Sequence, residues 1–268
     1  MAGDVSKRLG LYMRERRKTA GWDSLDRLAE KMEEIRKLKE KSQPHMGWDE
    51  VTVGASNLAK QESGLRWPTP KMLALWFEAV GISYYYRDQI RKLMSPELWQ
   101  LDWGELPTMP SADNMKVLRS YGTPAAYLSE PMWNLLGAND QFLEMFPGLD
   151  VGMNVAEWML SSDWARLRIH NWRLRTHILI AAVANIGRGI VPDEELQKFI
   201  DNCSEYPEFD HFWTTDPPEH LVLNTDLIMR MPDKTYRRYI SGTTHLYHPP
   251  TLFSGYSLTY DPEFEFAA

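Results

Sequence analysis

Side chains that can read the edges of DNA bases gather in one short stretch, residues 54–63. An Asn amide can bond adenine with both its donor and its acceptor. A Lys ammonium suits guanine or phosphate, and a Ser hydroxyl serves a base or a phosphate. If Val53 and Leu58 point to a core, helical spacing turns the candidate contact residues outward. These residues are Ala55, Ser56, Asn57 and Lys60.

The elements around this stretch are typical of a helix-turn-helix DNA reader. We predict a recognition helix from about Gly54 to Ser63, ended by Gly64, and a following helix over 70–80. Phosphate contacts would flank the base-reading side chains. The arginines expected over the phosphate backbone are Arg14, Arg16, Arg17 and Arg66. The alternative is a solvated basic helix in a plain α-helical domain.

Charge is distributed unevenly along the 268 residues. The net charge is −7, but residues 1–95 hold 18 Lys and Arg against 13 Asp and Glu, a net of +5. Residues 96–268 hold 12 against 24, a net of −12. A basic segment joined to an acidic one indicates that the first part meets phosphate and the second does not.

Hydrophobic periodicity predicts an all-α domain over 1–95, a Pro-rich linker over 96–112 and an α+β domain over 113–268. The N-terminal helices are expected at 5–19, 25–41, 54–63, 70–80 and 84–94. The later helices are expected at 140–146, 155–159, 164–185 and 194–203. The strands of an antiparallel sheet are expected at 132–138, 220–224, 236–241 and 253–260.

Large aromatic residues of the second domain are compatible with an apolar pocket. The candidate lining is Trp133, Phe142, Phe146, Trp158, Trp172, Phe212, Trp213 and Phe253. Polar groups for a ligand head group are Asn154, Arg173, His177 and His248. The competing interpretation is that these aromatics are core, as most such residues are.

The candidate motifs of catalysis and cofactor binding lack the required residues or context, so we expect no enzyme and no cofactor. There is no Gly-x-Ser-x-Gly elbow and no P-loop lysine after Gly187. On a strand, His245 and His248 would point to opposite faces, which disfavours a metal pair. The chain starts without a signal-peptide core, and its longest apolar run, 178–183, is too short for a membrane span. A single cysteine, Cys203, fits a reducing cytoplasm.

The segment from Leu9 to Gly81 resembles the XRE-type helix-turn-helix. It shares an Arg-rich first helix, a Leu-Ala pair at 28–29, and a Glu-x-Gly-x-x-x-Pro ending formed by Glu62, Gly64 and Pro68. It departs from that pattern by an insertion from Glu33 to Thr52 before the recognition helix. The insertion either brings lysines to phosphate or is a solvated charged helix; its lysines are Lys37, Lys39 and Lys41.

The second half resembles the ligand-binding domain of MmyB-like transcription regulators, which has a PAS-like fold. The pieces that carry the resemblance are Ala138 to Phe142, Gly152-x-Asn154, Asp163-Trp164, Asn171-Trp172, Pro207 to Trp213, and His248-Pro249. The family's Leu-Arg pair near Asn185-Ile186 is replaced here. The resemblance implies a small, apolar or fatty-acid-like ligand.

We therefore predict a cytoplasmic, sequence-specific transcription regulator. It would bind double-stranded DNA as a homodimer, respond to a small apolar ligand and have no membrane role. The alternative is a small-molecule-binding protein or enzyme whose helical N-terminal domain docks a protein partner.

Overall fold

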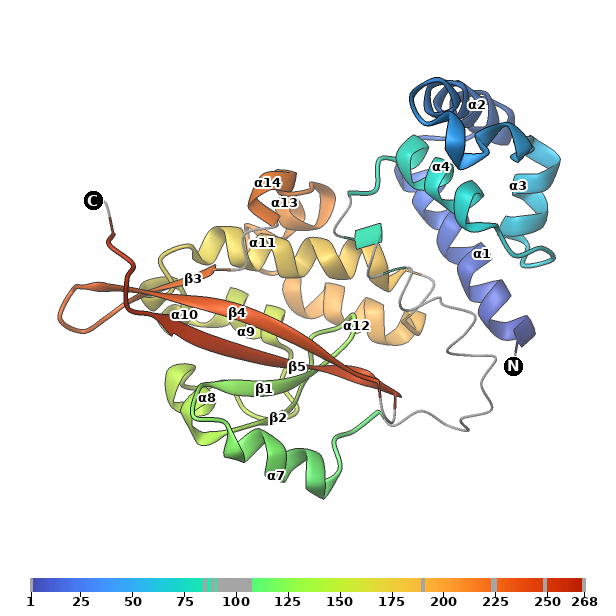
Figure 1. Ribbon diagram of the computed structural model, residues 1–268. Helices are drawn as coiled ribbons and strands as arrows, with labels where there is room; N and C mark the ends of the chain where they lie inside the picture. Colours follow the sequence, from blue (N-terminus) through green and yellow to red (C-terminus); the bar gives the residue numbers. More distant parts are fainter. Residues whose placement is uncertain are drawn as a thin grey trace. The chain divides into compact units, whose positions relative to one another are not determined.

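The protein consists of two compact units in the computed structural model (Figure 1). One unit comprises residues 1–102 with 185–193, and the other comprises 103–184 with 194–268. The expected linker and the helix expected at 84–94 lie largely outside the described residues. The structure describes residues 2–83, 86–87, 90, 108–188, 191–222, 226–247 and 250–266.

Helices form the first unit, as its apolar periodicity predicts. They are α1 Ala2–Thr19, α2 Leu25–Ser42, α3 Ala55–Glu62 and α4 Pro70–Val80, with short 3-10 turns at Pro44–Met46 and Trp48–Glu50. Ser24 caps α2 and Thr69 caps α4, each accepting a backbone N–H of the first turn. The fully buried core includes Tyr12, Met13, Leu28, Met32, Leu58, Leu75, Trp76 and Phe77.

The inserted segment Glu33–Thr52 packs on this unit. Its first residues lengthen α2, and its Trp48 is buried. The Trp48 carbonyl accepts a hydrogen bond from Arg36 Nη1 at 3.3 Å. Lys39 forms an ion pair of 2.7 Å with Glu78 of α4, so its ammonium is engaged inside the unit. Lys37 and Lys41 remain exposed.

The second unit is α+β, as expected. Its described strands form one five-stranded antiparallel sheet in the order β2-β1-β5-β4-β3. The strands are β1 Ala125–Ser129, β2 Leu135–Ala138, β3 Asp226–Arg230, β4 Tyr236–Tyr247 and β5 Pro250–Asp261. The helices after residue 108 are α7 Ala112–Ser120, α8 Asp140–Met145, α9 Val155–Ser161, α10 Asp163–Arg168, α11 Trp172–Ala182, α12 Asp193–Cys203, α13 Phe209–Thr214 and α14 Glu219–Val222, with a π-helix at Val183–Gly187.

Strand β1 is buried on both faces of the sheet. On one face Leu118 of α7 packs against Tyr127 and Phe253. On the other face Phe142 of α8 contacts Tyr256 of β5, with ring centroids 6.5 Å apart. Figure 1 shows α9 to α11 on the side of the sheet opposite α7.

Some of the predictions for the second unit were wrong. The helix expected at 164–185 is two helices, because Ile169 to Asn171 run along the edge of β3. The His170 N–H donates to the Ile228 carbonyl at 2.7 Å there. The strand expected at 220–224 is instead the helix α14, followed by β3. The strand expected at 132–138 starts only at Leu135, because Trp133 has a φ of 62° and turns the chain.

No helix among the described residues is long and apolar enough to span a bilayer.

Close packing of α1 on the end of α3 gives a first prediction. A Cβ on Gly10 would lie 2.6 Å from the Gln61 carbonyl oxygen, too close for any side chain. We expect Gly10→Ala to separate the two helices and destabilise this unit by about 1–3 kcal/mol. The measurement is amide hydrogen exchange, which should accelerate in α1 and α3. Gly122→Ala, where a Cβ meets nothing within 4 Å, is the control; equal exchange in both variants would contradict the prediction.

Candidate nucleic-acid interface

Helix α3 presents a polar face outward from an apolar anchor. Leu58 is completely buried, and Gln61 and Glu62 also point inward. Ser56 and Lys60 are exposed, and Ala55 and Asn57 are partly exposed. The helix therefore has the orientation that its spacing predicts.

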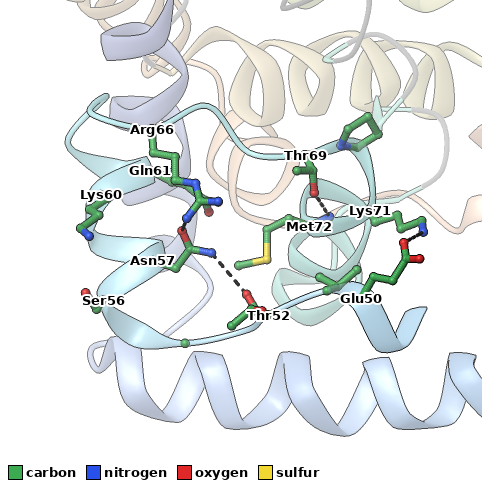
Figure 2. A pocket seen from close by; sticks show the side chains of 13 residues that line it. Glu50, Thr52, Ser56, Asn57, Lys60, Gln61, Arg66, Thr69, Lys71 and Met72 are labelled. Carbon is green, nitrogen blue, oxygen red and sulfur yellow. Dashed lines mark hydrogen bonds and ion pairs between the residues drawn. The ribbon is translucent and has the colours of Figure 1, made fainter. Parts of the chain in front are cut away.

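A cavity of about 760 Å³ lies beside α3. The loop that precedes α3 and the first turn of α4 form its other walls (Figure 2). The polar lining includes Thr52, Asn57, Arg66, Thr69 and Lys71. Lys71 is held by the Glu50 carboxylate at 3.6 Å and donates to the Gly47 carbonyl at 2.8 Å.

Asn57 and Arg66 are joined at the rim of this cavity. Arg66 Nη1 donates to Asn57 Oδ1 at 3.0 Å, and Asn57 Nδ2 donates to the Thr52 carbonyl at 3.3 Å. In Figure 2 these side chains point toward one another, whereas Ser56 and Lys60 point away from them. Nothing in the sequence pattern indicated the Thr52 contact, because it is made by a backbone carbonyl.

Two cations of this face are available for a ligand. Lys60 and Arg66 are exposed and form no ion pair within the described ranges of the chain. Arg14 is also accessible, with 48% of its side chain exposed and a long 3.9 Å contact to Glu62. A surface with unpaired cations attracts phosphate, because binding need not first break an internal ion pair.

Arg17 does not lie on this surface, contrary to our expectation. It is 7% exposed, and its guanidinium forms a two-pronged ion pair with Glu62, at 2.6 and 3.0 Å. The hydrogen bond with Glu62 raises the pKa of Arg17 further above its usual value. A buried, paired Arg holds α1 on α3 and cannot reach a phosphate. Arg16, from the same expected cluster, is partly buried.

The Arg17–Glu62 pair gives a second prediction. Arg17→Ala leaves the Glu62 carboxylate buried without its main partner, and we expect a loss of about 3–5 kcal/mol of stability. Arg17→Met combined with Glu62→Leu removes both charges and should lose much less. Urea unfolding of the three proteins measures this. A double variant less stable than Arg17→Ala would contradict the assignment.

Most of the aromatic residues expected to line a ligand pocket pack against other aromatic rings, in separate groups. Phe142, Phe146, Trp158 and Trp164 form one group. Trp172, Phe212 and His177 form another, and Phe199, Phe209 and Trp213 a third. Trp133 is 8% exposed. His248 lies outside the described residues.

Arg173 and Trp172, two of the expected ligand-binding residues, have internal contacts. The Arg173 guanidinium lies 5.6 Å from the Phe212 ring. Trp172 Nε1 donates to the Met159 carbonyl at 2.6 Å, and the Arg166 guanidinium covers the Trp172 ring at 4.1 Å. Glu208 holds Arg166 at 2.7 Å, which lowers the pKa of Glu208.

Three asparagines fasten the unit's chain segments. Asn154 caps α9 and donates to the Met132 carbonyl at 2.6 Å. Asn139 caps α8 and accepts from the Ala125 N–H at 3.0 Å. Asn171 bonds both a carbonyl and an N–H of β3, those of Asp226 and Ile228. Each amide replaces backbone hydrogen bonds where the chain is irregular.

No group of three or more His, Cys, Asp or Glu that could hold a metal occurs in the described part of the chain. The one cysteine, Cys203, is fully buried, and burial raises the pKa of its thiol to about 12. A thiol of such high pKa stays protonated and is a poor nucleophile at neutral pH.

His177 gives a third prediction. Burial lowers the pKa of His177, although its bond to the Thr215 carbonyl at 2.8 Å works in the opposite direction. His211 and Arg173 oppose protonation as well, and Asp216 favours it. A depressed folded pKa means that the unfolded chain binds a proton first. Stability is therefore complete above the usual His pKa of about 6.5 and is lost as the pH falls through the folded value.

The measurement is urea unfolding of the full chain at pH 7, 6 and 5. We expect His177→Phe, which cannot titrate, to be less stable at pH 7 but to lose less on acidification than the wild type. Parallel pH profiles of the two proteins would show that His177 is not responsible.

One family model matches part of the second unit. No curated protein matches the chain. Strands β4 and β5 lie beyond the last matched residue, 233. Residues 111–233 match the family of the MmyB-like transcription regulator ligand binding domain.

Proposed function

We propose that the protein is a sequence-specific DNA-binding transcription regulator under the control of a small molecule. The observation that carries this is the outward face of α3, where Lys60 is exposed on a helix anchored by Leu58 and Arg66 is exposed in the turn that follows. Ser56 adds a hydroxyl to the same face. A helix of this kind enters a major groove when its neighbours hold the phosphates.

The second unit would supply the control. Its match to a ligand-binding domain of transcription regulators supports a small-molecule effector, and we propose an apolar or fatty-acid-like one. Such an effector acts only by differing in affinity between DNA-competent and DNA-incompetent states of the protein. A homodimer on two half-sites about 34 Å apart would match the usual symmetry of such readers.

The first test is binding of the purified full chain to a duplex of its own upstream promoter region and to a scrambled duplex. We expect tighter binding to the promoter duplex and a steep loss of affinity with added salt. Equal binding to both duplexes, with and without a fatty acid present, would contradict sequence-specific reading.

Lys60→Ala sharpens this test as a fourth prediction. It removes one cation from the proposed surface, so the log–log salt slope should become shallower by about 0.9 and the affinity should fall. Lys31→Ala removes another exposed lysine, one of α2 that pairs with Glu34, and it is the matched control. The same slope for both variants would place the DNA elsewhere on the protein.

A further inference from the structure

We infer that Asn57 acts on DNA through Arg66: its amide fixes the Arg66 guanidinium, and Arg66 reads the base. Asn57 is then a positioning residue, although Asn on a recognition helix is the usual partner of adenine. The inference rests on the proposed function and assigns roles within its surface.

The Asn57 amide is already committed in the folded chain. Its oxygen accepts from Arg66 Nη1 at 3.0 Å and its nitrogen donates to the Thr52 carbonyl at 3.3 Å. Two-point recognition of adenine needs both atoms of the amide, facing the same base edge. Each amide atom of Asn57 already serves one internal partner and retains one further site, a lone pair on Oδ1 and an N–H on Nδ2, so Arg66 and Thr52 set the orientation of the side chain.

Arg66 retains most of its hydrogen-bonding capacity. A guanidinium carries five N–H donors, and Asn57 takes one through Nη1. Arg66 is exposed and has no ion pair among the residues that the structure describes. Its remaining donors can bond O6 and N7 of guanine, which is the commonest specific contact of Arg with DNA.

The anchor of this arrangement is the inserted segment. Thr52 is its last residue, and the segment is tied down by the buried Trp48 and by Lys71, which holds the Gly47 carbonyl. A backbone carbonyl at a fixed place orients the amide, and the amide orients the guanidinium. A side chain held in its binding conformation loses less rotamer entropy on contact with DNA.

The experiment is selection of duplexes from a randomised library by the full chain and by three variants: Asn57→Ala, Arg66→Ala and the double variant. The enriched base at each position is read, and affinities are measured on the duplex that the wild type selects. Arg14→Ala, alone and with Asn57→Ala, is the control pair because Arg14 lies on another helix. Amide hydrogen exchange checks that α3 remains folded.

We expect Arg66→Ala to remove the preference for guanine at one position and to weaken binding roughly 10- to 100-fold. Asn57→Ala should weaken the same preference and no other, with an affinity loss of about five-fold, the order of one net hydrogen bond. The double variant should bind within about two-fold of Arg66→Ala, because removal of Asn57 has nothing left to disturb. Losses in the control pair should multiply.

Several results would overturn the inference while the proposed function stands. One is loss of an adenine preference in Asn57→Ala at a position that Arg66→Ala leaves intact. Others are a double variant whose loss is the product of the single losses, or an Asn57→Ala variant that weakens binding equally on every duplex. Selection of no preferred sequence by the wild type would instead reject the proposed function, and this inference with it.

Discussion

The buried ion pair between Arg17 and Glu62 fixes the orientation of α3, and the surface proposed to contact DNA depends on that orientation. It joins the last turn of α1 to the last turn of α3, across 45 residues of sequence. Two charges removed from water tolerate little displacement, because any separation leaves them uncompensated. Gly10 permits the close approach that the pair needs, since a Cβ there would collide with the Gln61 and Glu62 carbonyls. With α3 so held, its opposite face must point outward.

The inserted segment fixes the orientation of a single side chain on α3. It was expected either to reach phosphate or to be a solvated helix, and both descriptions miss its main structural feature. Trp48 is buried and Lys39 pairs with Glu78, so the segment is a built part of the helical unit. Its final residue, Thr52, bonds the Asn57 amide, and this contact connects an irregular loop to the outward face of α3.

In the second unit, side-chain amides join segments that are distant in the sequence. Asn139 and Asn171 bond the first residues of β1 and β3, and Asn154 bonds the turn between β1 and β2. Two of them also cap helices, so one residue both starts an element and fixes it to its neighbour. Asn139 and Asn154 are buried, and these hydrogen bonds satisfy their polar groups. The aromatic residues between them fill the interior in separate groups.

Local features of the chain were decided by the sequence itself. Periodicity and turn chemistry act over a few residues, and they predicted α3, α4 and the α+β class. They also predicted that glycines 64 and 81 follow the ends of these two helices. Tertiary structure alone decided the partners: Arg17 with Glu62, Asn57 with Thr52 and Arg66, and residues 169–171 with the edge of β3. A residue's type states what it can bond, but burial and distance select the bond it makes. These depend on segments that meet only after the chain has folded.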